Sequence, residues 1–142
     1  MCSSDLTAFS SVNNHDKPAV VQIARDLRDV GFRLVATRGT ANYLRVHGLD
    51  VEIVFKVNEG RPHVGDEILN NRIQLVINTP LGRESFFDDR TVRRIAMMHS
   101  VPCITTLTGA AASVNAIKAL HTDGLTVRAL QEYHAQAATD RA

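Results

Sequence analysis

The chain is poor in cysteine, in net charge and in long apolar runs, and each shortage excludes a class of protein. Its two cysteines, Cys2 and Cys103, lie far apart and neither belongs to a Cys-x-x-Cys pair, so a redox or zinc-binding thiol pair is not indicated. The formal net charge is only +1, without the basic patch of a nucleic-acid or membrane-surface partner. No apolar run approaches the roughly 20 residues of a membrane-spanning helix. We therefore expect a soluble domain with neither nucleic-acid nor membrane partners.

Several motifs of catalysis, metal binding and targeting are also missing. The six histidines show neither His-x-His nor His-x-x-x-His spacing, which argues against a metal site. There is no P-loop, no Gly-x-Gly-x-x-Gly and no nucleophile-elbow motif. The first residues lack the basic and apolar regions of a signal peptide, so we expect a cytoplasmic protein with reduced thiols. The residues alone thus predict no catalytic group and no metal site.

What the sequence does contain is a regular alternation of short apolar runs and amphipathic segments. Strands are expected at residues 7–12, 32–36, 51–57, 73–77 and 101–104, and helices at 17–30, 40–47, 64–70, 88–99 and 107–120. Asp16 is expected to be the N-cap of the first helix and Gly31 to close that helix. Residues 125–130 and 131–138 are less clear and indicate a strand or turn followed by a helix.

This alternation predicts an α/β fold with one parallel five-stranded sheet and helices on both faces, a Rossmann-like three-layer arrangement. The 142 residues fit a single domain, which we place at residues 7–138, with loose ends at 1–6 and 139–142.

Polar groups gather where the expected strands end, the edge at which open α/β sheets bind ligands. The clearest case is Thr37-Arg38-Gly39-Thr40, where an apolar strand passes into a helix. Gly39 allows close approach of the backbone, and two hydroxyls with the free amides of a helix start can surround a phosphate. The alternative is that Thr40 only caps the helix and Gly39 only forms the turn, and these four residues alone favour both about equally.

Other strand ends add weight to the anion-binding interpretation. A single lysine is usually a solvated charge, but Lys17 and Lys56 both fall on this edge, where they could face the same anion. Asn78 follows the most apolar strand, where it either caps the strand or binds a base or sugar hydroxyl. The acids at 88–89 and arginines at 93–94 are explained by the helix dipole and by i,i+4 pairs such as Asp89–Arg93. The residues thus indicate an anion-binding α/β domain without visible catalytic machinery.

Five segments occur together in an order and spacing that one family shares. They are Ser11-Val12 with Asp16-Lys17, Ala36-Thr37-x-Gly39-Thr40, Lys56-Val57-x-Glu59-Gly60-Arg61-Pro62-His63, Val76-Ile77-Asn78-Thr79 and Val92-Arg93-Arg94. Over residues 7–134 the sequence resembles the C-terminal methylglyoxal-synthase-like domain of the carbamoyl phosphate synthase large subunit. Each segment alone is weak evidence, but the combination is highly specific.

The resemblance implies a regulatory function. In that family the domain carries no chemistry and no cofactor, and it binds a nucleoside monophosphate effector, typically uridine or inosine monophosphate. The parent enzyme is a ligase that uses ATP and Mg²⁺ to make carbamoyl phosphate from glutamine and bicarbonate, for pyrimidine and arginine biosynthesis. The implied partners are the synthetase core of the large subunit and the glutaminase small subunit, and a homo-oligomer stays open.

Carried over position by position, the resemblance also implies the effector site. The residues expected around the phosphate are Ser11, Lys17, Thr37, Gly39 and Thr40, with Arg38 at the variable place of the turn. Those expected along the rest of the nucleotide are Lys56, Asn78, Thr79, Pro80 and Asp88. Lys56 would contact the sugar or phosphate, and Asn78 and Thr79 the sugar and base. Pro80 stands where some relatives have a hydroxyl residue, and Asp88 lies near the edge of the site.

The alternative is a stand-alone methylglyoxal-synthase-like lyase, or a cyclohydrolase, that acts on a phosphorylated substrate. Methylglyoxal synthase resembles this chain in its Gly-Thr phosphate loop, and it carries its catalytic aspartate in a Gly-Gly-Asp segment. The corresponding region here is Glu59-Gly60-Arg61-Pro62, and an arginine cannot act as the base. The resemblance therefore favours the regulatory domain.

Overall fold

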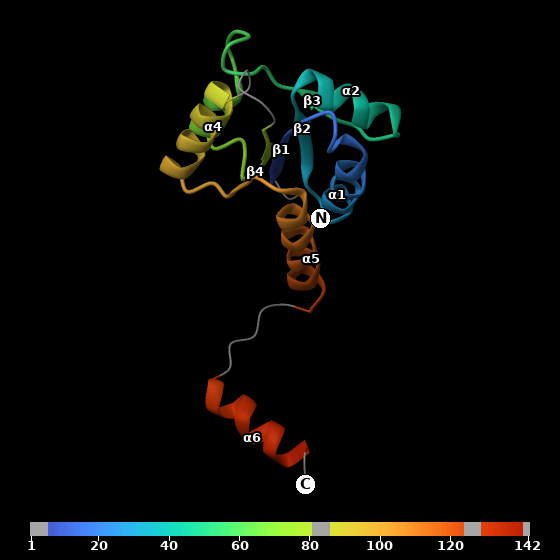
Figure 1. The fold of residues 1–142 in the computed structure, drawn as a ribbon, viewed down its shortest axis with the longest axis vertical. Coiled ribbons are helices and arrows are strands. Elements are labelled where there is room, and N and C mark those ends of the chain that lie inside the picture. The colour runs from blue at the N-terminus through green and yellow to red at the C-terminus, as the bar shows by residue number, and fades with distance from the viewer. Residues whose placement is uncertain (1–5, 81–85, 124–128, 141–142) are drawn as a thin grey trace.

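Five parallel strands form the centre of the molecule, in the spatial order β3-β2-β1-β4-β5. The computed structural model describes residues 6–80, 86–123 and 129–140 (Figure 1). The strands are β1 (Thr7–Val12), β2 (Arg33–Ala36), β3 (Glu52–Ile53), β4 (Leu75–Thr79) and β5 (Cys103–Ile104). β1 lies in the middle and pairs in parallel with both β2 and β4. The predicted parallel five-stranded sheet is confirmed.

Helices cover both faces of this sheet, as the alternation predicts. They are α1 (Lys17–Asp29), α2 (Arg38–Val46), α3 (Val64–Leu69), α4 (Phe86–Met98), α5 (Leu107–Asp123) and α6 (Leu130–Asp140). One apolar core joins α1, α2 and α5 to the sheet through side chains such as Ala8, Leu34 and Ile77. A second core joins α3 and α4 to the opposite face through Phe9 and Val76. Figure 1 shows α1 and α2 on one side of the strands and α4 on the other.

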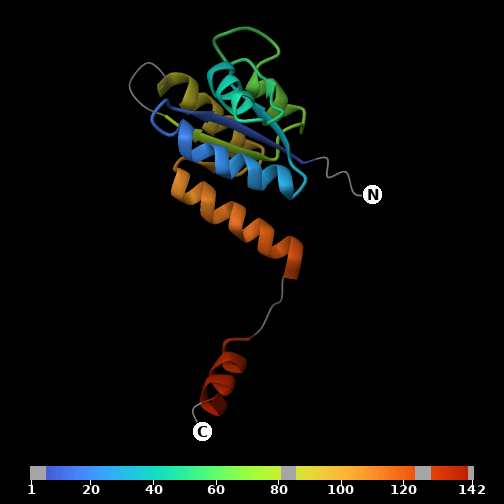
Figure 2. The same cartoon turned by 90° about the vertical axis from the view of Figure 1, so that its right-hand side faces the viewer.

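The last helix is separate from this body. Figure 2, turned by 90°, shows α6 well away from the sheet and its covering helices, as does Figure 1. Its bounds, Leu130–Asp140, extend the helix expected at 131–138 at both ends. Residues 1–5, 124–128 and 141–142 lie outside the described residues. Most of the segment expected as a strand or turn at 125–130 therefore also lies outside them. No helix in the described ranges has the length and apolar character needed to span a membrane.

Several element boundaries differ from the sequence predictions, and the changes in β3 and β4 follow from hydrogen bonding between strands. β3 is only Glu52–Ile53, because the chain beyond leaves the ladder apart from one bridge between Phe55 and His63. β4 lies two residues later than expected, because its pairing with β1 continues to the end of that strand, where Val12 faces Thr79. α2 begins at Arg38, so its N-cap is Thr37 and not Thr40.

The first helix is bounded as expected, although its cap differs in detail. Asp16 is the N-cap of α1, but its carboxylate makes no cap hydrogen bond to the helix. Instead it accepts a hydrogen bond from Asn13 Nδ2 at 2.6 Å. Gly31 follows the helix with φ of 97°, the left-handed conformation that glycine adopts without strain.

His63 fixes the start of α3 against α4. Its Nδ1 accepts hydrogen bonds from the backbone amides of Gly65 (3.0 Å) and Asp66 (3.3 Å), while the Asp66 carboxylate accepts one from the His63 amide at 2.9 Å. This reciprocal pair is a capping box. Gly65 permits it, because a Cβ there would lie 2.9 Å from both His63 Cε1 and Ile95 Cδ1. His63, the last residue of the Glu-Gly-Arg-Pro-His segment, thus caps a helix.

We predict that His63→Ala lowers the free energy of unfolding by about 1–3 kcal/mol, because it removes the cap and leaves buried amides without an acceptor. Urea unfolding followed by circular dichroism measures the change. His99→Ala, at an exposed position after α4, is the matched control and should stay within about 0.5 kcal/mol of wild type. Equal stability of the two variants would show that the cap contributes nothing measurable.

Candidate functional site

A pocket of about 630 Å³ opens at the carboxyl edge of the sheet. It lies where the order of strands reverses, between β1 and β4, which is where doubly wound sheets bind ligands. Its volume is within the range of small-molecule sites. The wall contains all eleven residues that the sequence predicts for an effector site: Ser11, Lys17, Thr37, Arg38, Gly39, Thr40, Lys56, Asn78, Thr79, Pro80 and Asp88.

The Thr37 hydroxyl, at the start of α2, makes only long hydrogen bonds. It is the N-cap residue, yet its side chain makes no cap hydrogen bond. Its Oγ1 lies 3.5 Å from Ser11 Oγ and 3.4 Å from Thr40 Oγ1, longer than the usual 2.5–3.0 Å of a hydroxyl hydrogen bond. Because the first amides of α2 also receive no side-chain cap from Thr37, the turn presents several donors that an anion could accept.

Thr40 has a different task. It is only 1% exposed, and its Oγ1 accepts a hydrogen bond of 3.2 Å from the Val12 backbone amide. Val12 is the last residue of β1, so this bond ties the first turn of α2 to the end of the central strand. The two hydroxyls of the Thr-Arg-Gly-Thr turn are therefore not equivalent: Thr40 Oγ1 ties the turn to β1, whereas Thr37 Oγ1 makes only two long contacts.

Lys17 brings a positive charge directly to this turn. A Cβ added to Gly39 would lie 3.3 Å from Lys17 Nζ, so the ammonium group rests against the Gly39 backbone. The same ammonium donates to Asn14 Oδ1 at 2.5 Å, which holds the side chain over the turn. Glycine at position 39 leaves the space that this contact needs.

A hydrogen-bonded loop holds the start of α1 against β4. The Asn13 amide and its side-chain Nδ2 both donate to Thr79 Oγ1 at 3.3 Å, and Nδ2 also donates to the Thr79 carbonyl at 3.2 Å. Asn13 Oδ1 accepts from the Asp16 amide at 3.0 Å. The Thr79 hydroxyl, predicted to face the sugar or base, is thus engaged by Asn13. Asn13 is not among the residues that the sequence predicted for the site.

The opposite part of the pocket is built around Asn78 and the start of α4. Asn78 is 2% exposed and lies beside Ser11 in the β1–β4 register. Among the described residues its side-chain amide makes no hydrogen bond, so it is available to a ligand. Val57, Val64 and Val92 add apolar surface that the strand ends did not indicate. They come from separate segments that only the folded chain brings together.

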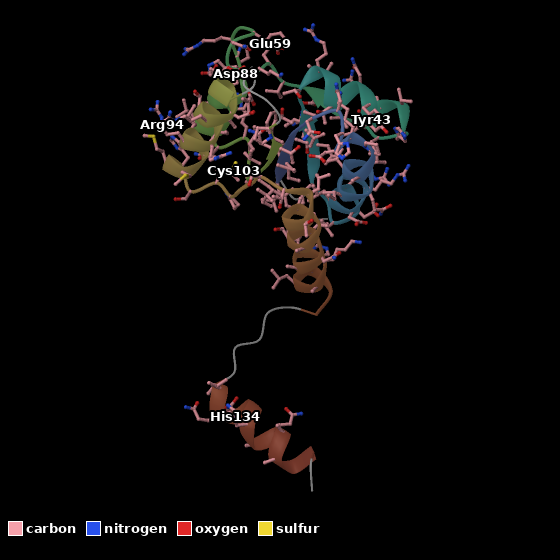
Figure 3. All side chains as sticks on the ribbon, viewed as in Figure 1. Tyr43, Glu59, Asp88, Arg94, Cys103 and His134 are labelled. Carbon is pink, nitrogen blue, oxygen red and sulfur yellow. The ribbon has the colours of Figure 1, made fainter. Side chains whose placement is uncertain are left out.

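Carboxylates are more numerous here than the strand ends suggested. Glu59, Asp88 and Asp89 all line the pocket, and Figure 3 shows Glu59 and Asp88 at the same end of the molecule. Glu59 closes the turn after β3, where its Oε2 accepts from the Lys56 amide at 2.9 Å. The predicted Asp89–Arg93 ion pair is wrong: within the described residues Asp89 has no ion pair, and its Oδ2 has no hydrogen-bond partner.

In the described part of the chain, no cluster of three or more His, Cys, Asp or Glu residues could hold a metal ion.

Fold and pocket together define a doubly wound α/β domain whose ligand edge carries an anion-compatible turn. The chain matches the family described as "MGS-like domain" over residues 19–105, and it belongs to that family. Its curated relatives are named carbamoyl phosphate synthase large chain. That of Synechocystis sp. is 49% identical over 128 residues, which cover 89% of this chain and 12% of the relative. That of Acidobacterium capsulatum is 47% identical over 129 residues, with 91% and 12% covered.

A shorter relative locates the similarity within those long proteins. The "carbamoyl phosphate synthase large chain, C-terminal section" of Methanopyrus kandleri is 46% identical over 129 residues, which cover 90% of this chain and 24% of that section. The chain therefore spans about an eighth of the full-length relatives. The resemblance stated from the five sequence segments is confirmed at the level of the family and of these relatives.

Solved structures support the fold alone. The crystal structure of methylglyoxal synthase from Elizabethkingia anophelis aligns with a TM-score of 0.58 at 18% identity, covering 76% of this chain and 75% of that one. The structure named ForH aligns with a TM-score of 0.57, also at 18% identity, covering 84% and 81%.

The two threonines of the turn provide a matched test of this site. We predict that Thr40→Val lowers the free energy of unfolding by about 1–3 kcal/mol, because the buried Val12 amide loses its acceptor. Thr37→Val should change stability by less than about 0.5 kcal/mol, because its hydroxyl makes only long contacts. Urea unfolding of both variants measures the difference. Equal losses would contradict the division of tasks between the two hydroxyls.

Proposed function

We propose that this domain binds a nucleoside monophosphate effector, uridine or inosine monophosphate, and regulates a carbamoyl phosphate synthase large chain. The observation that carries the proposal is the turn at the start of α2, where the Thr37 hydroxyl and the helix amides are open and Lys17 rests against Gly39. A phosphate placed there would accept charge-assisted hydrogen bonds, each contributing roughly 1.5–3 kcal/mol. The helix dipole adds about 0.3–1 kcal/mol.

The remainder of the pocket suits the rest of a nucleotide. Lys56 is half-buried after β3 and lies on the same wall as the turn. Asn78 lines the pocket, where its amide could bond a sugar hydroxyl, and the three valines of the lining would pack against a base. Pro80 and Asp88 lie at the edge.

The relatives support a regulatory position within a larger enzyme. Their printed name is carbamoyl phosphate synthase large chain, and this chain corresponds to a small part of each. By this proposal the parent is the cytoplasmic, ATP- and Mg²⁺-dependent ligase that serves pyrimidine and arginine biosynthesis. The synthetase core and the glutaminase small subunit would be the partners of the domain, which would need no cofactor of its own.

We predict that Lys17→Ala and Thr37→Val each weaken binding of uridine and inosine monophosphate at least tenfold, since about 1.4 kcal/mol corresponds to one decade. The nucleosides without phosphate should lose still more, because the turn then has no anion to bind. Isothermal titration calorimetry measures each affinity.

Lys118→Ala is the control, because this lysine pairs with Asp26 at 2.8 Å and neither residue lines the pocket. It should bind as wild type does. Equal affinities for nucleotide and nucleoside would show that the turn serves only as a helix start.

A non-catalytic domain should also fail to act as a methylglyoxal synthase. The segment in which that enzyme carries its aspartate here contains Arg61, which is exposed and cannot accept a proton as a base. We predict that dihydroxyacetone phosphate incubated with the chain forms no methylglyoxal above the level of a heat-inactivated sample. An authentic methylglyoxal synthase serves as the positive control, and turnover by this chain would favour the lyase alternative.

A further inference from the structure

The pocket has two ends of opposite chemistry. Around the turn it carries the positive charges of Lys17, Arg38 and Lys56, with one carboxylate, Glu59, whose Oε2 accepts from the Lys56 amide. On the α4 side it carries Asp88 and Asp89. A ligand that fills the pocket therefore meets donors at one end and acceptors at the other, and a phosphate would avoid the second end.

Asp89 is the unusual member of this second end. It is only 8% exposed, and its Oδ2 has no hydrogen-bond partner. A carboxylate buried without a partner is costly, and native proteins seldom keep one unless it has a task. Asp88, its neighbour, is half-buried and shows no such orphaned atom among the described residues.

The fold places Asp89 well away from the turn. Asp89 belongs to α4, whose Val92 and Ala96 pack against Val76 of β4 and Cys103 of β5. The turn, in contrast, follows β2, and Asn78 lies on β4. The β2 and β4 strands are two strand spacings apart, roughly 10 Å. A phosphate at the turn would thus leave the base, not the phosphate, near Asp89.

We propose that Asp89 determines the base specificity of this pocket, by accepting a hydrogen bond from a ring N–H of the bound nucleotide. The proposal rests on the proposed nucleoside monophosphate function. An ionised carboxylate is an acceptor only. Hypoxanthine and uracil present a ring N–H on the Watson–Crick edge, while adenine and cytosine present a lone pair at the corresponding nitrogen. The ring N–H of hypoxanthine or uracil can donate to the unpaired oxygen of Asp89. The ring nitrogen of adenine or cytosine would instead place its lone pair opposite that oxygen, so that two acceptors face each other.

Two matched ligand pairs test this inference, because each pair keeps the ring size constant. Calorimetry should give at least tenfold tighter binding of inosine than of adenosine monophosphate, and of uridine than of cytidine monophosphate. In Asp89→Asn both preferences should fall below about threefold, because an amide can donate to the lone pair that the carboxylate repels. Asp50→Asn, at an exposed position before β3, is the control and should keep both preferences.

Other outcomes overturn the inference in distinguishable ways. If wild type binds all four nucleotides equally, and Lys17→Ala weakens them all, the proposed function stands and the base-reading role of Asp89 is wrong. If Asp89→Asn weakens all four by the same factor, the carboxylate contacts the sugar and the inference also fails. If none of the four binds, the proposed function fails with it.

A stability measurement tests the premise without any ligand. Removing an unpaired buried charge should leave the melting temperature of Asp89→Asn equal to or above that of wild type. A clear fall would show that the carboxylate is satisfied within the protein, which contradicts the inference.

Discussion

The pairing of β1 with both β2 and β4 is the constraint on which the site depends. Because all three strands run in parallel, their carboxyl ends meet at one edge and deliver Ser11, Thr37 and Asn78 to the same pocket. The hydrogen bond from the Val12 amide to Thr40 Oγ1 completes this arrangement, since it ties the start of α2 to the end of the central strand. Without it, the open donors of the turn would not be held beside Lys17.

The polar residues of the pocket fall into two groups, those engaged by hydrogen bonds within the protein and those that are not. Thr40 and Asn13 use their polar groups within the protein, whereas Thr37 and Asn78 keep theirs available. The same division holds in the Glu59-Gly60-Arg61-Pro62-His63 segment, where His63 caps α3 and Glu59 closes the turn that carries Lys56. This segment therefore contains residues that hold the pocket wall as well as a residue, Lys56, that lines it.

Much of the site was accessible to sequence reasoning because strand ends have a fixed meaning in parallel α/β folds. Once the alternation of strands and helices is recognised, a lysine, a Thr-x-Gly-Thr turn and an asparagine at strand ends must lie on one edge. All eleven positions that the family resemblance implied line the pocket, and all but Asp88 lie at or just after strand ends. Sequence reasoning did not identify Asp89 as a pocket residue. It lies near the start of a helix in which arginines follow two acids, and this pattern is explained equally well by the helix dipole and surface ion pairs.

The sequence by itself determined the order and type of the elements, the parallel sheet and the edge where a ligand would bind, since these follow from apolar periodicity and strand ends. Only the tertiary structure decided where β3 stops, which threonine caps α2 and which carboxylate is buried. Those features depend on partners distant in the chain: Val12 for Thr40, Thr79 for Asn13, and the packing of α4 on Val76 and Cys103 for the helix that carries Asp89. The local sequence pattern carries no information on such contacts, because they join residues that come together only in the folded chain.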